Sequence, residues 1–201
     1  FSGYKATFER GVTEAGCVAH ARRKFHELWA NHGSKVGEQA LRYFQVLFRI
    51  EEEVATATAE ERRRLRQRKS RRVAAALKKW LLAQRQLVPD GSATAKAIDY
   101  SLKRWQALTR YIDDGDVPIS NNWVENQIRP IALGRSNWLF AGSLRAGKRA
   151  AAVMSLVHSA KINGHDPYAY LKDVLQRLPT QAASKIEELL PHRWKPLAVA
   201  N

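Results

Sequence analysis

Apolar residues recur with helical spacing through the middle of the chain. From residue 36 to residue 54 they fall three and four positions apart, with none of the alternation of a strand, which predicts a helix. Thr58 followed by Glu61 has the pattern of a capping box and predicts the start of a second helix. This helix is expected to run to Leu87, because the turn sequence PDG follows at 89–91.

A third helix is expected to begin after Ser92, which can cap it. Its apolar stripe is Ile98, Leu102, Trp105, Leu108 and Ile112. Residues 36–113 are therefore expected to be nearly all helical and to pack as hairpins of two or three long segments.

The segments on either side show mixed patterns. The small and apolar run EAGCVAHA at 14–21 predicts a short buried strand, and the amphipathic RRKFHELWA after it predicts a helix. Further on, Ser120 or Asn121 can cap a short helix that Pro130 should end or kink. The remaining expected helices run from 144 to 163, from Asp166 with Pro167 through 178, and over a short segment after 179.

The charge of the chain is strongly positive. Thirty-four Lys and Arg oppose 19 Asp and Glu, which gives a formal net charge of +15 and an attraction to polyanions such as nucleic acid or an acidic membrane face. No apolar run reaches the roughly 18 to 20 residues of a membrane-spanning helix, and no secretory signal is recognised. A single cysteine, Cys17, excludes an internal disulfide. These features favour a cytoplasmic protein with no membrane partner.

One carboxylate stands out in this basic chain. On a helix, Asn121 and Asn122 lie one turn before Glu125 and Arg129 lies one turn after it, so the four side chains can share a face. An apolar edge adjoins them, made of Val124, Ile128 and Ile131, which would seat Glu125 between core and solvent. One interpretation is an ordinary ion pair near a helix start, worth about 0.3 to 0.5 kcal/mol.

The residues that follow favour a second interpretation. Basic side chains are interleaved with amide and aromatic groups suited to phosphates and exposed bases: Arg129, Arg135, Asn137, Trp138, Phe140, Arg145, Lys148 and Arg149. A carboxylate among them repels DNA unless a divalent cation lies between it and a phosphate. Mg²⁺ takes oxygen ligands in this way, so Glu125 is a candidate metal ligand.

The same stretch resembles a known family. The sequence DGDVPISNNWVENQIRPIALGRSNWLFAGS at 114–143 is similar to the signature of bacterial transposases of the insertion sequence 66 family. GCVAHARRKF at 16–25 and SAKINGHDPYAYLKDVLQRLP at 159–179 resemble two further segments of that family, in the same order. The resemblance implies the C-terminal part of an RNase H-like α/β core with a long helical insertion, in a chain that is mainly α.

This resemblance implies a division of the chain and a chemistry. The expected parts are a strand and helix of the core at 1–35, the insertion at 36–113, the Glu-bearing and core-completing helices at 114–178, and a C-terminal helix and tail at 179–201. In the family, an Asp, Asp, Glu triad holds two Mg²⁺ ions for cleaving and joining DNA strands at transposon ends. Glu125 matches the glutamate, and a homo-oligomer acting at the bacterial nucleoid is expected.

The two aspartates of the triad have no match in this chain. They lie upstream in the family, the second just before a segment similar to FSGY, so the chain is expected to begin immediately after it; its own seven aspartates match neither position. The 201 residues alone are therefore predicted to be inactive. The rival interpretation is a non-catalytic DNA-binding remnant or regulator that keeps the basic surface.

Further candidates concern DNA contacts. Arg22 and Arg23, after His20, are expected near the active-site edge in contact with DNA, the alternative being a helix start that faces solvent. Asn122 is expected to contact DNA beside Glu125. The run RRRLRQRKSRR at 62–72 is either a contact to the DNA backbone or a solvated outer face. Among the tryptophans, Trp29, Trp80 and Trp105 are expected in the core, whereas Trp123 and Trp138 could instead stack on a base.

Overall fold

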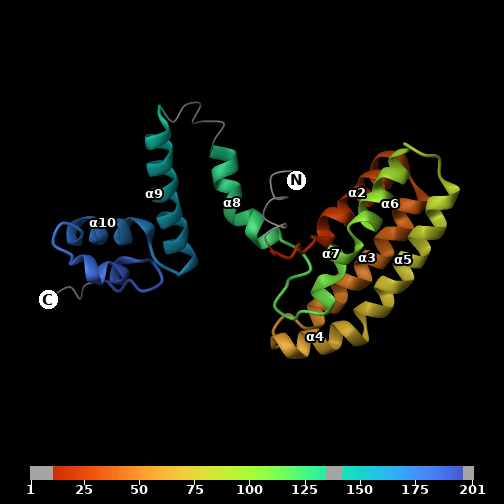
Figure 1. The fold of residues 1–201 in the computed structure, drawn as a ribbon, viewed down its shortest axis with the longest axis horizontal. Helices are drawn as coiled ribbons and strands as arrows, with labels where there is room; N and C mark the ends of the chain where they lie inside the picture. The colour runs from red at the N-terminus through yellow and green to blue at the C-terminus, as the bar shows by residue number, and fades with distance from the viewer. Residues whose placement is uncertain (1–10, 135–141, 197–201) are drawn as a thin grey trace. The chain divides into compact units, whose positions relative to one another are not determined.

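The chain is helical in a computed structural model that describes residues 11–134 and 142–196. It forms two compact units, Phe1–Trp123 and Val124–Asn201, and we describe each by itself. No strand occurs in the described ranges, which confirms the prediction of a mainly α chain (Figure 1). None of the helices in these ranges is both long and apolar enough to cross a membrane.

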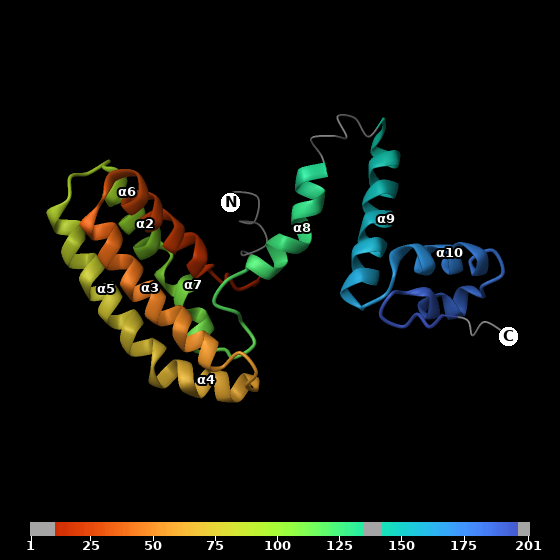
Figure 2. The same ribbon diagram turned by 180° about the vertical axis from the view of Figure 1, so that it is seen from behind.

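The first unit is a bundle of long helices with shorter ones at its end. Figures 1 and 2, from opposite sides, show α2, α3, α5 and α6 side by side. The elements in chain order are α2 (Val18–His32), α3 (Lys35–Glu53), α4 (Ala59–Arg68), α5 (Ser70–Leu87), α6 (Ala93–Lys103), α7 (Trp105–Thr109) and the 3₁₀ helix η2 (Arg110–Ile112).

Local capping fixes where these helices begin. The Ser34 side chain accepts the Gly37 N–H at 3.2 Å, and Ser92 accepts the Ala95 N–H at 3.1 Å. Thr58 and Glu61 form the predicted capping box, in which each side chain accepts a hydrogen bond from the other residue's backbone N–H. The helix starts at 59 and 93 therefore follow from short-range chemistry alone.

The expected strand at 14–21 is wrong. Residues 18–21 form the first turn of α2 and 14–17 are a loop. One N–H group of the loop and one at the helix start donate to different segments. The Gly16 N–H donates to the Ala107 carbonyl at 2.8 Å and the Val18 N–H to the Ile119 carbonyl at 3.0 Å. No single neighbouring segment offers a ladder of partners, so these bonds anchor a loop and make no sheet.

Two expected helices are each divided. The helix predicted to run from 58 to 87 breaks at Lys69 into α4 and α5, and the one predicted to run from Ser92 to 113 breaks at Arg104. At the first break both Arg66 and Ser70 are buried. The change of direction lets α4 turn a charged side chain inward while α5 keeps an apolar face on the core.

The core of the first unit is made by all its long helices. Its members include Phe25, Phe44, Leu77, Leu81, Ile98, Leu108 and Tyr111. Trp80 and Trp105 pack against it as predicted, but Trp29 is 45 % exposed, so its expected burial is wrong. Residues 1–35 and 36–113 thus share one core through α2 and α3, while the four-part division of the chain stays a prediction.

A buried ion pair joins α3, α4 and the connection after η2. Arg66 is only 2 % exposed, and its guanidinium donates to both Glu51 oxygens, at 2.9 and 2.6 Å. Its Nη1 also donates to the carbonyls of Tyr111, Asp114 and Val117, at 2.9 to 3.0 Å. All three nitrogens of this buried cation are therefore hydrogen-bonded, as a charge removed from water requires.

The second unit contains the end of the chain. Its elements are most of α8 (Asn122–Gly134), α9 (Leu144–Ile162), α10 (Pro167–Arg177) and the 3₁₀ helix η3 (Ala183–Leu189). Asp166 caps α10 and Pro167 opens it, as predicted. A small core forms around Tyr170, whose hydroxyl donates to the Leu189 carbonyl at 2.9 Å, and Trp194, whose indole N–H donates to Asp173 at 2.6 Å.

Replacing Arg66 by methionine should lower the free energy of unfolding of the first unit by about 3 to 5 kcal/mol, because Glu51 and the carbonyls are left buried without their donor. Urea unfolding of the chain measures the change. The double variant Arg66→Met with Glu51→Met should recover part of the loss. The control is Arg64→Met, which removes an exposed ion pair to Glu60; an equal loss in both single variants would contradict the prediction.

Tyr111 should make the first unit sensitive to alkali. Burial, and then the charge of Glu51, raise the pKa of the Tyr111 hydroxyl; it interacts with Ser70, but neither hydroxyl completes a hydrogen bond of normal geometry. Above about pH 10 the unfolded chain releases this proton while the folded chain retains it. The free energy of unfolding should therefore fall as pH rises, by up to about 1.4 kcal/mol per pH unit.

Tyr111→Phe should flatten this decline, because phenylalanine has no proton to lose. Urea unfolding of both proteins at several values between pH 8 and pH 11 tests the difference. Equal slopes for the two proteins would show that Tyr111 does not ionise on unfolding.

Candidate nucleic-acid interface

Helix α8 carries the candidate carboxylate in its first turn. Glu125 is half-buried, and Asn122 one turn earlier is exposed. An acid in this position is favoured by the partial positive charge of the helix start. Asn122, Glu125 and Arg129 therefore lie on one helix at the predicted spacing, and Glu125 is reachable from solvent.

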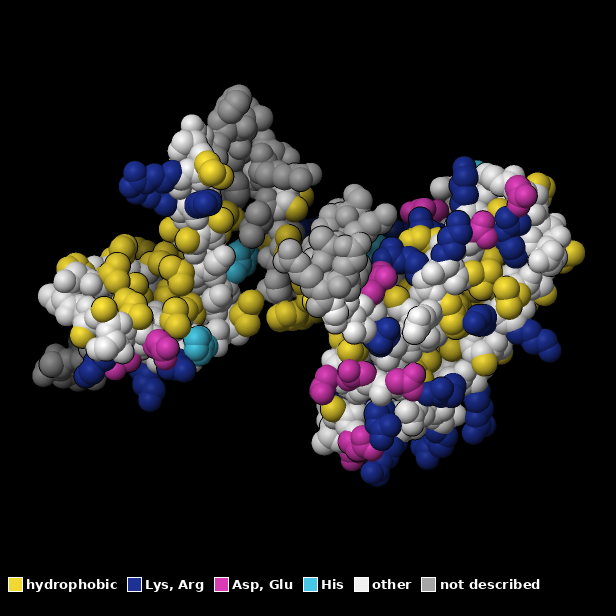
Figure 3. Space-filling view, viewed as in Figure 1, with side chains coloured by type: hydrophobic (Ala, Val, Ile, Leu, Met, Phe, Trp, Pro, Cys, Tyr) yellow, Lys and Arg dark blue, Asp and Glu magenta, His cyan; other side chains and the backbone are white. Residues whose placement is uncertain are grey.

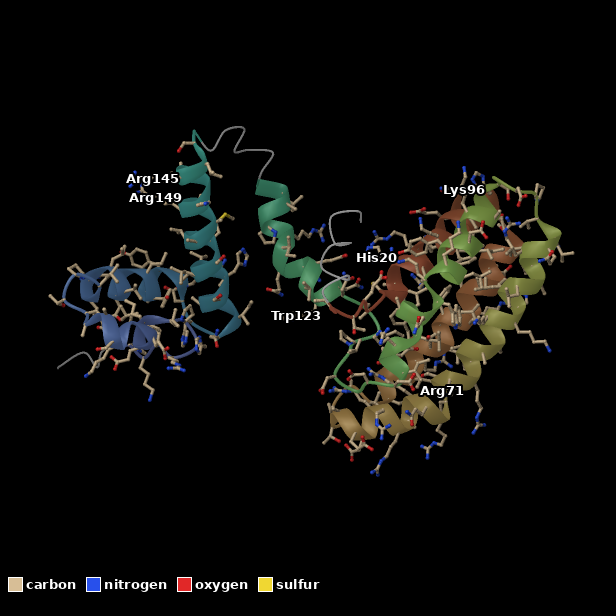
Figure 4. The ribbon with its side chains drawn as sticks, in the orientation of Figure 1. His20, Arg71, Lys96, Trp123, Arg145 and Arg149 are labelled. Atoms are coloured by element: carbon tan, nitrogen blue, oxygen red, sulfur yellow. The ribbon has the colours of Figure 1, made fainter. Side chains whose placement is uncertain are left out.

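The apolar edge beside Glu125 differs from the expectation. Val124 and Ile128 are 47 % and 54 % exposed, and Trp123 before them is 63 % exposed, so these side chains are not covered by other described residues. Trp123 is labelled in Figure 4 at the start of α8. The prediction that Glu125 sits at the border of a packed core is therefore not supported by the residues that the structure describes.

Pro130 does not end α8. The helix continues through it to Gly134, although the missing N–H leaves the Asn126 carbonyl without its usual partner. The ribbon of α8 bends along its length (Figure 1). Arg129 is exposed one turn after Glu125, as predicted.

A second basic group lies at the start of α9. The Ser143 side chain caps this helix by accepting the Ala146 N–H at 3.1 Å. Arg145, Lys148 and Arg149 follow at spacings that place them on one face, and all three are exposed. Figure 4 shows Arg145 and Arg149 on the same side of the helix. None of the three makes an ion pair with a described residue, so this face can receive an anion.

Four of the residues predicted to contact DNA lie outside the described residues: Arg135, Asn137, Trp138 and Phe140.

Arg22 lies in a groove of the first unit. The groove runs between α2 and α3 and has a volume of about 650 Å³. Its lining residues are Ala19, Arg22, Leu41, Gln45, Phe48, Arg49, Glu52 and Asn122. Arg23, the neighbour of Arg22, is exposed and does not line the groove.

The densest basic run is largely used within the protein. Arg63 and Arg64 both donate to Glu60, and these hydrogen bonds lower the pKa of Glu60 to about 2. Arg66 is buried, and other members bond to neighbours: Arg62 to Gly115, Lys69 to Glu53 and Arg71 to Asp113. Arg68 and Arg72 remain exposed, with Lys78 and Lys79 beyond them. Most of this run is thus neither a free DNA contact nor simply solvated.

Space-filling views support this distribution. On the first unit in Figure 3, acidic and basic side chains lie next to each other around α4. The mixture is consistent with internal ion pairs in that region.

The carboxylate at 125 does not by itself form a metal site. Among the described residues, no group of three or more His, Cys, Asp or Glu side chains is placed to hold a metal ion. Glu125 supplies carboxylate oxygens, the donor that Mg²⁺ prefers, but a complete set of protein ligands needs more than one such group.

Sequence reasoning missed Arg49 and Gln45. They lie on α3, for which the apolar spacing predicted only the residues of the buried face. Gln45 and Arg49 are one turn apart, and the groove they line exists only because α2 packs beside α3. Their spacing of one helical turn was a signal in the sequence. The sequence did not show which helix would lie opposite them.

Comparison with protein-family models accounts for almost the entire chain. Residues 1–149 match the model described as Transposase IS66 family, and residues 155–192 match the IS66 C-terminal element. Glu125, Arg145, Lys148 and Arg149 all lie inside the first match.

Curated relatives from Sinorhizobium fredii (strain NBRC 101917 / NGR234) have comparable similarity. The chain is 37 % identical over 202 residues to "Uncharacterized protein y4hP", covering 94 % of the chain, and 40 % identical over 200 residues to "Uncharacterized protein y4qI", covering 97 %. It spans 37 % of the length of each of these relatives. No solved structure matches the chain. With a family model covering residues 1–149, the chain belongs to the IS66 family of transposases.

Proposed function

We propose that the chain is part of a transposase that binds DNA and acts in phosphoryl transfer at transposon ends, with Glu125 as one ligand of the catalytic metal ions. The observation that carries the proposal is the family match over residues 1–149, within which Glu125 is half-buried in the first turn of α8. The exposed basic residues of α8 and α9 give such an enzyme a surface for its polyanionic substrate.

The proposed fold of the complete enzyme is RNase H-like. The helices of the second unit and α2 would complete an α/β core whose strands lie outside the described residues, and the bundle built from α3 to η2 would be the helical insertion. The support is the family match, because the described residues contain helices only.

The proposed cofactor is Mg²⁺, two ions in the complete enzyme. When bound, they would supply an activated oxygen nucleophile and stabilise the leaving oxygen. Glu125 would hold one or both through its carboxylate, and the remaining acidic ligands would come from outside the described residues. Because one carboxylate is not a complete site, no catalytic step is assigned to this chain alone.

The chain's own residues would position DNA. Arg129 on α8 and the basic face of α9 would bind backbone phosphates, since guanidinium groups match phosphate oxygens with paired donors. Asn122, exposed one turn before Glu125, would donate its amide to a sugar or phosphate oxygen beside the metal ligand. Arg135, Asn137 and Trp138, within the same family match, would extend this surface.

The proposal includes three expectations about the whole protein. It works on chromosomal DNA in the bacterial cytoplasm, it acts as a homo-oligomer that brings two DNA ends together, and these 201 residues alone bind DNA without cleaving it. The rival candidate is a non-catalytic DNA-binding regulator. Both interpretations predict binding, and they differ in whether Glu125 is needed for cleavage by a chain that includes the upstream segment.

Replacing Glu125 by glutamine should abolish Mg²⁺-dependent cleavage, by at least about a hundredfold, in a protein that joins this chain to the upstream part of an IS66 transposase. Glutamine keeps the size of the side chain and removes the charge that binds the metal. The measurement is nicking of a labelled duplex with and without Mg²⁺, together with DNA binding in its absence.

Binding without Mg²⁺ should be unchanged or slightly tighter, because a negative charge has been removed. The matched control is Glu188→Gln, a surface acid of the same chain with no proposed role. Full cleavage by the Glu125→Gln protein would reject Glu125 as a metal ligand, and no cleavage by the unmodified protein would favour the regulator.

Replacing Arg145, Lys148 and Arg149 together by glutamine should weaken binding of the 201-residue chain to a 30-base-pair duplex and make it less dependent on salt. Loss of three phosphate contacts lowers the slope of log affinity against log salt by about three. Fluorescence anisotropy at several salt concentrations measures both effects.

A control variant carries the same change of charge elsewhere in the second unit. Lys161, Lys172 and Lys185 are exposed and lie outside the proposed face, so their replacement by glutamine should change the slope much less. Equal slopes for the two triple variants would show that α9 contributes only net charge.

A further inference from the structure

We propose that the groove between α2 and α3 in the first unit is a seat for one backbone phosphate of the bound DNA, held between Arg22 and Arg49. This inference rests on the proposed function, because it assigns a contact to the same DNA substrate. It adds a site in the helical bundle, formed by residues that are distant in sequence from the basic face of α9.

The groove brings together two arginines from different helices. Ala19 and Arg22 are one turn apart on α2, and Gln45 and Arg49 are one turn apart on α3. The small side chain at position 19 leaves space between the helices. Leu41 and the half-buried Phe48 form the apolar part of its lining, against the core.

Neither arginine is engaged within the part of the protein that the structure describes. Arg22 and Arg49 make no hydrogen bond or ion pair with the described residues, and both are exposed. Other arginines of the same unit are engaged: Arg42 with Glu38, Arg66 with Glu51, Arg85 with Asp99 and Arg104 with Glu14. Two unpaired guanidinium groups facing one groove favour an anion that accepts several hydrogen bonds, as a phosphate diester does.

The remaining polar groups indicate where the phosphate would lie. Gln45, one turn before Arg49, can donate its amide to a phosphate oxygen, whereas Glu52, less than one turn after Arg49, would repel it. The phosphate is therefore assigned to the part of the groove lined by Arg22, Gln45 and Arg49, on the Gln45 side of Arg49 and away from Glu52. Glu52 should weaken the site that the arginines create.

Asn122 gives the site its relation to the proposed function. It lines the groove and is the first residue of α8, three positions before Glu125. A strand held by Arg22 and Arg49 would therefore pass the start of the helix that carries the candidate metal ligand. The groove would fix the register of the DNA, since phosphate contacts position a duplex without reading its sequence.

The test measures binding of the 201-residue chain to a 30-base-pair DNA duplex by fluorescence anisotropy, at several salt concentrations. Arg22→Gln and Arg49→Gln should each weaken binding about tenfold. Because both hold one phosphate, the double variant should lose less than the product of the two single losses, and its salt slope should fall by about one. Glu52→Gln should tighten binding.

Arg42→Gln is the matched control, since it makes the same change of charge on the same helix at a residue that does not line the groove. It should alter affinity by less than about twofold. Losses for Arg22→Gln and Arg49→Gln no greater than for this control would overturn the phosphate seat while leaving DNA binding intact. Circular dichroism checks folding, and if a glutamine variant does not fold, Arg49→Lys with Glu52→Gln tests the site instead.

Two further outcomes bear on the substrate. Failure of the unmodified chain to bind the duplex would overturn both the proposed function and this site. Tighter binding of a 30-base-pair RNA duplex, with the same dependence on Arg22 and Arg49, would overturn the assignment to DNA.

Discussion

The buried charge of Arg66 is the constraint on which the first unit depends. A guanidinium withdrawn from water must be matched by acceptors on all sides, and here they come from Glu51 on α3 and from carbonyls of the connection at 111–117. The bundle therefore cannot form with α4 in another place without leaving a charge or several carbonyls unpaired. The ion pair specifies an arrangement more than it adds stability, since burying two charges offsets most of their attraction.

This arrangement determines where α8 begins. The connection from η2 is held by Arg66 and by Arg62, whose side chain donates to the Gly115 carbonyl at 2.9 Å, and Ile119 accepts the Val18 N–H. The chain therefore leaves the first unit at a fixed point, beside the start of α2. In this way a charge network in the helical bundle fixes the point at which the chain enters α8, at Asn122.

Local features of the fold could be predicted and long-range ones could not. The capping pairs at 58 and 61 and at 166 and 167 place helix starts because the atoms involved are a few residues apart. The break at Lys69 depends on burying Arg66 against residues some 45 positions away, and the loop at 14–17 depends on single carbonyls of two other segments. In the candidate site, the helix bearing Glu125 and the basic residues of α9 followed from spacing. Arg49 did not, because a groove requires knowing which two helices are neighbours.

The turn between α5 and α6 and the connection after η2 differ in how much change they can accept. At the turn between these helices, a side chain added at Gly91 would meet nothing within 4 Å, so only backbone conformation is constrained there. At Gly115, an added Cβ would lie 1.7 Å from the Ala59 carbonyl oxygen, which no relaxation of a side chain can relieve. Length variation and attached labels or inserted domains should therefore be tolerated at the 88–92 turn and rejected at 113–117. The hairpin offers a natural place to mark or extend the protein far along the chain from Glu125.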